Sequence, residues 1–480
     1  MSASSCIVYP FDSEQVNIAF GKSNHADYLR GYFRTLKAET CVIEKNYIDK
    51  DFTIDYQKFY CRTFNKPKRE TTRIHVFSSN FNETRFFDSI RLNKADNNEI
   101  SYLIDSYLGF VVMRPIEDKA KNFIVGRTLV KTYPPNERDI TRVFVTETYP
   151  SSLFGVPLKI KSLPFQAKDR GVSACATVAL WAALHPLKDT FDLPRHSPAE
   201  ITEMATSFPS SNRRFPSTGL TSEQMMNYIN LLGLDVEIIK PKDDDAIHTA
   251  VKAYLFAGLP ILASLKMTEN SEKKEKTEED FLDKRHAVAI SGYQMDNGRC
   301  IRELYVHDDA FGPYCKVEPD GNFLTWKYDW APRGYKVKLE DLRIPIYPKV
   351  RTTFYHMFDE YLNQRKKWEE KVNHELEAML SRTQRKAEAE KEAIIKEISN
   401  SFKLELILTS NRAYKAFLLG NSIKDKNELL TKLLPRFIWV MRLYYKFEPI
   451  QDSIFDSTSI YAEPLGDVDY QSKNSIFRKE

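Results

Sequence analysis

Residue types that could perform nucleophilic catalysis occur in the order cysteine, histidine and aspartate along this chain. Cys175 stands where a short polar, glycine-containing segment passes into the apolar run 176–184. We therefore expect Cys175 in the first turn of a buried helix, whose N-terminus favours negative charge and hence thiolate over thiol. His286 opens an alternating segment and Asp308 ends a later one, so both are expected on strands. A thiol, an imidazole and a carboxylate placed in this way could carry out acyl transfer.

Each of these residues has a predicted role. His286 would take the thiol proton and pass it to the leaving group, and Asp308 would accept a hydrogen bond from the imidazole and fix its tautomer. The sequence leaves Asp309 open as the third member in place of Asp308. Gln166 is a candidate oxyanion donor, together with the backbone N–H of Cys175. For each of these residues the alternative is an ordinary structural role: a cysteine packed in the core, a histidine with its hydrogen bonds satisfied, an aspartate in a turn and a glutamine on the surface.

Composition limits the class of protein. A length of 480 residues predicts two or three domains, and 42% hydrophobic residues are enough for packed cores. The net charge of +4 is small for this length and gives no strong nucleic-acid signal. The six cysteines are scattered without a CxxC pair, which is typical of a reducing compartment. Without a membrane-spanning apolar run or a secretory signal, we expect a cytoplasmic protein.

No cofactor or metal is expected from the motifs. Neither GxxxxGK nor GxGxxG occurs, so a nucleotide cofactor is not predicted. The cysteine spacing indicates no zinc site. His307, Asp308 and Asp309 follow one another and could suggest a metal, but no further ligand stands at helix or strand spacing.

The elements that must position these residues fall into three regions. Residues 1–150 read as an α/β recognition or structural domain, with strands expected at 52–56, 73–77 and 107–113. Residues 351–480 are rich in charge and read as a helical region, with a long solvated helix over 360–401.

The middle region, 151–350, carries the chemistry. Ser197 and Thr221 are expected to be N-caps of two helices, and strands are expected at 236–239 and 261–265. The mostly charged run 269–280 precedes His286 and is expected to be a loop that could gate the site.

The ordered set of motifs in this middle region resembles a known group of enzymes. The motifs are Gln166, Cys175-Ala176-Thr177, Gly219-Leu220-Thr221, Gly258-Leu259-Pro260-Ile261-Leu262-Ala263, His286-Ala287-Val288-Ala289-Ile290-Ser291-Gly292-Tyr293 and Val306-His307-Asp308-Asp309. They resemble the papain-like cysteine peptidase superfamily and are most similar to the bacteriocin-processing (double-glycine leader) peptidases. The resemblance covers residues 151–320, about a third of the chain.

This resemblance implies an α+β protein with a papain-like peptidase domain, flanked by an N-terminal α/β region and a C-terminal helical region. It also implies catalysis by Cys175, His286 and Asp308, with Gln166 as oxyanion donor. The expected function is a cysteine hydrolase that cleaves an amide or peptide bond in a peptide or protein substrate. The outer regions would recognise the substrate or a protein partner. The alternatives are an acyltransferase or transglutaminase-like enzyme, and a non-catalytic binding module.

Overall fold

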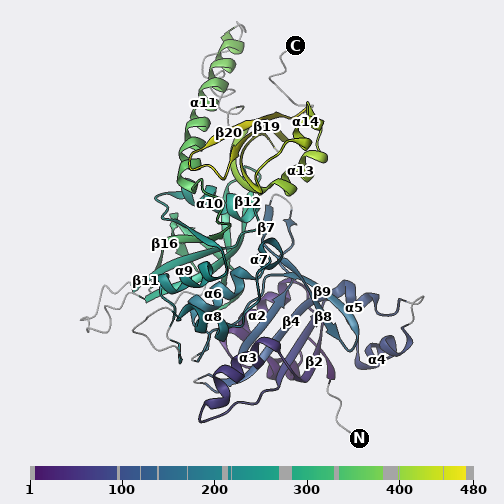
Figure 1. Ribbon diagram of the computed structural model, residues 1–480. Coiled ribbons are helices and arrows are strands. Elements are labelled where there is room, and N and C mark those ends of the chain that lie inside the picture. The colour runs from purple at the N-terminus through teal and green to yellow at the C-terminus, as the bar shows by residue number, and fades with distance from the viewer. Residues whose placement is uncertain are drawn as a thin grey trace.

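The chain forms three units that follow one another from the N-terminal to the C-terminal end, as a computed structural model shows (Figure 1). The structure describes residues 6–93, 98–118, 120–137, 140–169, 171–207, 215–217, 219–269, 284–328, 335–381, 398, 401–446 and 448–471. Within these residues, no helix combines the length and the apolar character that crossing a membrane requires.

The N-terminal unit is built on a five-stranded sheet in which every pairing is antiparallel. Its strands, in both sheet and chain order, are β1 (Cys6–Pro10), β2 (Thr40–Tyr47), β3 (Thr71–Phe77), β4 (Tyr107–Glu117) and β5 (Phe123–Val130). One face packs against α1 (Glu14–Phe20) and α2 (Asn24–Thr35). The other face packs against α4 (Glu83–Leu92), α5 (Ser101–Ser106) and the hairpin of β8 (Glu147–Leu153) and β9 (Val156–Ser162).

The strand expected at 52–56 is wrong, because this segment lies in α3 (Lys50–Lys58). The Asp49 side chain caps the helix by accepting a hydrogen bond from the Phe52 N–H at 3.0 Å. Phe52 and Asp55 are both buried, at the three-residue spacing of one helix face. The cap and this spacing outweigh the aromatic and β-branched content that suggested a strand.

The middle unit contains a closed antiparallel barrel of six strands, because the last strand pairs back onto the first. The strands are β11 (Ile261–Glu269), β12 (Lys284–Asp296), β13 (Ile301–Asp308), β14 (Gly312–Asp320), β15 (Asn322–Lys327) and β16 (Tyr335–Ile346). Three further strands extend the sheet beyond the barrel, namely β6 (Asn136–Glu137), β7 (Ile140–Phe144) and β10 (Asp235–Ile239).

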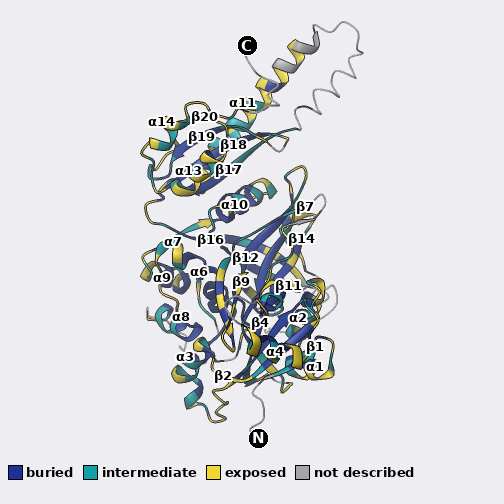
Figure 2. Cartoon of the chain, turned by 90° about the vertical axis from the view of Figure 1, so that its right-hand side faces the viewer, coloured by how far each residue is buried: buried dark blue, intermediate teal, exposed yellow. Residues whose placement is uncertain are grey.

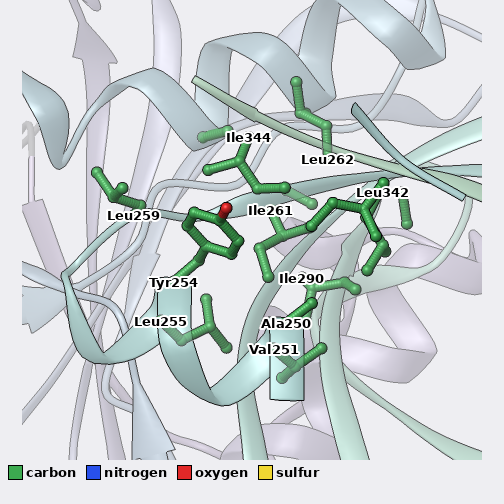
Figure 3. Packing of buried hydrophobic residues seen from close by; sticks show 14 of the residues in the cluster. Ala250, Val251, Tyr254, Leu255, Leu259, Ile261, Leu262, Ile290, Leu342 and Ile344 are labelled. Atoms are coloured by element: carbon green, nitrogen blue, oxygen red, sulfur yellow. The ribbon is translucent and has the colours of Figure 1, made fainter. Parts of the chain in front are cut away.

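Helices surround this barrel: α6 (Cys175–Leu184), α7 (Leu187–Phe191), α8 (Pro198–Ala205), α9 (Ser222–Leu231) and α10 (Asp244–Phe256). The predicted N-caps Ser197 and Thr221 are confirmed, and each forms a complete capping box. Figure 3 shows how Tyr254 and Leu255 of α10 pack beside Ile261 of β11 and Ile344 of β16. In Figure 2, α6 and the barrel strands are largely buried.

The C-terminal unit is a four-stranded antiparallel sheet with helices beside it. The sheet consists of β17 (Phe402–Ser410), β18 (Phe437–Tyr445), β19 (Glu448–Asp456) and β20 (Glu463–Asp469), and the short helices are α13 (Asn411–Leu419) and α14 (Lys426–Thr431). The described part of the expected long helix is α11 (Phe354–Ser381), which extends away from the sheet in Figure 1. Residues 382–397 lie outside the described part.

The predicted fold class therefore needs correction, although the chain does mix helices and strands. The N-terminal region does mix helices and strands, but its sheet is antiparallel throughout, and the C-terminal region contains a sheet rather than helices alone. The middle strands close into an antiparallel barrel, and the structure shows no papain-like fold. The physical reason is that the order of motifs along a chain does not determine which distant strands form hydrogen bonds. The pairing of β11 with β16 joins residues that are 66 to 81 positions apart in the sequence.

Candidate active site

Cys175 is the first residue of α6, as the sequence predicted. The N-cap residue is Ala174, whose side chain makes no capping hydrogen bond, and every helix residue after Cys175 is buried. The N–H groups of the first turn therefore have no side-chain acceptor at the cap. A negative charge beside this end of the helix would be stabilised. α6 packs against β12, the strand that carries His286.

His286 lies between the Cys175 thiol and a carboxylate. Its Nε2 lies 3.0 Å from Oδ2 of Asp308, and the Cys175 side chain is close enough to the ring to raise its pKa as a hydrogen-bonding group. Because Nε2 is engaged by the carboxylate, Nδ1 is the ring nitrogen left for the thiol. The backbone N–H of Ala310 donates to Oδ1 of Asp308 at 2.8 Å and thereby fixes the carboxylate. The structure thus brings three of the predicted residues together.

Asp309 is a second carboxylate beside the same ring. Its Oδ1 lies 3.6 Å from His286 Nε2, compared with 3.0 Å for Asp308. Neither carboxylate oxygen of Asp309 has a hydrogen-bond partner among the described residues, although Lys168 Nζ lies 3.7 Å from Oδ2. Burial, together with the charge of Asp308, raises the pKa of Asp309 to about 6. Distance and hydrogen bonding both favour Asp308 as the partner of the imidazole.

The pKa of His286 reflects two opposing effects. Burial alone would lower it, because a charged ring is poorly solvated there. The charge and hydrogen bond of Asp308, the hydrogen bond to Cys175 and the charge of Asp309 together raise the pKa well above the usual 6.5. The ring is therefore cationic at neutral pH and can donate a proton.

Cys175 and His286 both line one cavity of about 1030 Å³. Its walls come from the start of α6, from α9 and from β11, β12 and β16. The lining includes apolar side chains, among them Leu220 and Met225, and charged groups of both signs. A half-buried thiol thus faces a space large enough for a segment of polypeptide or a small molecule.

Gln166 lies apart from this cavity. It is 2% exposed, does not belong to the described lining, and donates from Nε2 to the Ser173 hydroxyl at 2.9 Å. Because Ser173 is two residues before Cys175, this bond ties Gln166 to the loop that precedes the thiol. The structure therefore does not bring the Gln166 amide to the cavity wall.

The loop before Cys175 is held by Asp169, a residue that the sequence analysis missed. Its Oδ1 accepts hydrogen bonds from the N–H groups of Gly171, Val172 and Ser173, at 2.8–3.0 Å. Its Oδ2 lies 3.0 Å from Arg114 of β4, and both side chains are buried. Arg114 and these N–H groups lower the pKa of Asp169 although burial alone would raise it. An aspartate two residues before a glycine was the available signal in the sequence.

The N-terminal unit contacts both loops of the site. A Cβ added to Gly171, before Cys175, would lie 2.5 Å from the Phe59 ring, and one added to Gly312, after Asp308, would lie 2.2 Å from Tyr28. His25 Nε2 lies 2.9 Å from the carbonyl oxygen of Asp309. Because the rings of Phe59 and Tyr28 come this close, a side chain larger than that of glycine would not fit at Gly171 or Gly312. These contacts also show that residues far from the motifs determine the positions of the thiol and the carboxylates.

A cation could compete for the same groups. His286, Asp308 and Asp309 each offer a ligand atom within 4.8 Å of the others, and this is the one such group of three found among the described residues. Nitrogen and carboxylate ligands of this kind suit several divalent metals. The predicted gating loop, residues 269–280, lies outside the described part of the chain from residue 270 onward.

Comparison with known proteins adds nothing to this geometry. No family model matches the chain, and no curated protein matches it.

Proposed function

We propose that this chain is a cysteine hydrolase that cleaves an amide or peptide bond through an acyl-enzyme. One observation carries the proposal: the thiol of Cys175 and the ring of His286 line the same large cavity, with Asp308 behind the ring. A nucleophile, a base and a group that orients the base are the three parts that such chemistry needs.

The reaction would begin from an ion pair in which the Cys175 proton already resides on His286. The thiolate attacks the carbonyl carbon of the substrate, a C–S bond forms, and the carbonyl oxygen becomes negative. When the tetrahedral intermediate collapses, the C–N bond breaks and the leaving amine takes the proton from His286. Water then loses a proton to His286 and attacks the thioester, the C–S bond breaks, and release of the acid restores the Cys175 thiolate beside the protonated ring. Asp308 holds the ring in place and stabilises its charge in each step.

The oxyanion would be stabilised at the start of α6. The backbone N–H of Cys175 lies in the uncapped first turn, so it can donate to an oxygen bound beside the thiol. Gln166, the other predicted donor, would have to leave the Ser173 hydroxyl to take part. We assign Gln166 to holding the loop instead.

We infer a peptide or protein segment as the substrate. The cavity volume and its mixed lining suit an extended chain with both apolar and polar side chains. The described cysteines Cys41, Cys61, Cys175, Cys300 and Cys315 are all free, which supports a reducing compartment such as the cytoplasm.

An activated ester tests the proposed chemistry without requiring the natural substrate. We expect p-nitrophenyl acetate to give a burst of p-nitrophenol and an acetyl group on Cys175, detected by peptide mass spectrometry. The burst should vanish in Cys175→Ala. The matched control is Cys300→Ala, which removes an exposed thiol outside this cavity and should keep the burst. A burst that persists in Cys175→Ala would contradict the proposal.

The same experiment separates hydrolysis from acyl transfer. Adding an amine such as glycine ethyl ester should leave acetate as the main product if water resolves the acyl-enzyme. Amide as the main product at low amine concentration would indicate a transferase. The absence of acylation in the wild type would favour a binding module.

A further inference from the structure

A second cavity lies in the N-terminal unit, away from the Cys175 thiol. It has a volume of about 440 Å³ and is formed by the sheet face that also packs against β8, together with the segment before α8. We call it the arginine cavity. Its characteristic lining side chains are Tyr47, Arg73, Phe110, Arg127, Tyr149 and Arg195.

The three arginines of this cavity are held by carboxylates that are not part of its wall. The ion pairs are Arg73–Glu44 at 2.7 Å, Arg127–Asp49 at 2.9 Å and Arg195–Glu147. Within the described lining, the cavity has no acidic side chain. Each guanidinium is thus anchored from outside, while the groups that face the space are cations, aromatic rings and hydroxyls.

The aromatic rings further fix the guanidinium groups. Arg73 lies 3.9 Å from the ring centroid of Tyr47, and Arg195 lies 5.2 Å from that of Tyr149. Arg127 donates to the Tyr47 hydroxyl at 3.2 Å and lies 5.7 Å from the Phe110 centroid. Guanidinium groups held in this way lose little rotamer freedom when they bind an oxyanion.

Two other cavities provide a contrast. The cavity at Cys175 includes Glu223, Glu340 and Asp341 beside its lysines and arginines. A cavity of about 390 Å³ between the middle and C-terminal units includes carboxylates, among them Asp245 and Glu405. The walls of these two cavities thus include carboxylates that would repel an anion, whereas the described wall of the arginine cavity includes none.

We propose that the arginine cavity binds a small organic oxyanion that carries a flat apolar group. The phosphate or carboxylate end would lie against Arg127 and Arg195, because the planar guanidinium donors match both groups. The apolar end would lie against Phe110 and Leu129, which also line the space. The volume lies within the range of small-molecule sites. This site is independent of the thiol chemistry proposed above.

Calorimetric titration of the full chain with phenyl phosphate, benzoate and phenol tests the proposal. The two anions should bind and phenol should not, and added salt should weaken binding. Tighter binding of phenyl phosphate than of benzoate identifies the ligand as a phosphate, and the reverse order identifies a carboxylate. Absence of saturable anion binding up to about 10 mM would overturn the proposal.

Matched arginine variants locate the binding. Arg127→Gln and Arg195→Gln should each weaken anion binding about tenfold, the loss expected for one charged hydrogen bond. Arg34→Gln should leave binding unchanged, because Arg34 is an exposed arginine paired with Asp12 outside the cavity. The Arg195 side chain is one-third exposed, so its variant remains informative if Arg127→Gln fails to fold. Equal losses in Arg34→Gln and Arg195→Gln would overturn the assignment.

Discussion

A cysteine and a buried histidine occur together in two regions of the middle unit, and the two histidines have opposite pKa shifts. Cys175 and His286 form one region, and Cys315 and His307 lie on the neighbouring strands β14 and β13. Burial lowers the pKa of His307 to about 3, although a hydrogen bond from its Nδ1 to the Pro164 carbonyl opposes this. The carboxylates beside His286 instead raise its pKa well above 6.5. Burial alone therefore produces a neutral ring, and paired acids produce a proton donor.

The two thiols also differ, in their burial and in their access to a cavity. Cys315 is fully buried, and its sulfur lies 3.3 Å from the Gly312 carbonyl. Cys175 is half-buried, begins a helix and faces a cavity. The comparison teaches that residue type is not enough to identify a site. The neighbouring charges and access to solvent decide which cysteine and histidine can react.

The largest expected difference is between the two cysteine variants. Cys175→Ala should lower the rate of acyl transfer to p-nitrophenyl acetate by at least about 10⁴-fold, because the nucleophile is lost. Cys315→Ala should keep the acylation rate and lower the free energy of unfolding by about 1 kcal/mol, since core packing and a weak thiol hydrogen bond are lost. Stopped-flow kinetics and urea unfolding measure the two effects. Equal losses of the acylation rate in the two variants would contradict the claim that only the Cys175 region is reactive.

Asp308→Asn should have the next largest effect. An amide in place of the carboxylate cannot stabilise the imidazolium, so the acylation rate should fall by about 10²- to 10⁴-fold. His307→Phe is the matched control, because His307 lies among aromatic rings and is neutral. It should leave the acylation rate unchanged once the folded fraction is accounted for.

The N-terminal unit should contribute to the site through one buried ion pair. Arg114→Met leaves the Asp169 charge buried without its partner, and we expect the free energy of unfolding to fall by about 3–5 kcal/mol. Urea unfolding measures this loss. Arg34→Met breaks the exposed pair with Asp12 and should cost at most about 1 kcal/mol. Similar losses in both variants would mean that Arg114 does not anchor the Cys175 loop.

The smallest expected effect concerns pH. Asp309 is charged above its pKa of about 6, and its charge helps to raise the pKa of His286. Asp309→Asn should therefore lower the pKa of His286 and move the alkaline fall of the pH–rate profile down by roughly one unit. The wild-type rate should hold well above pH 6.5, because the ring stays protonated there. An unchanged alkaline limb would show that Asp309 does not act on the ring.

The sequence was sufficient where the signals are local. The apolar run after Cys175 predicted α6, and the alternation after His286 predicted β12, because each pattern reflects one buried face or core helix. The capping residues Ser197 and Thr221 marked their helices for the same reason.

Contacts between distant segments could not be predicted in this way. The Arg114–Asp169 pair joins two units, and closure of the barrel depends on pairing across many intervening residues. The strands of the C-terminal sheet were missed because the charged composition of that region suggested helix. The cavity, which Cys175 lines and Cys315 does not, likewise forms only when distant segments fold together.

Competitive alkylation tests the central claim most directly. Native protein would be treated with limiting iodoacetamide near pH 6, where ordinary thiols are protonated, and each cysteine would be quantified by peptide mass spectrometry. The account predicts that half-buried Cys175 reacts faster than exposed Cys300, and that this advantage disappears in His286→Phe. Faster reaction of Cys300 in the wild type, or an unchanged ratio in His286→Phe, would contradict the claim that His286 activates Cys175.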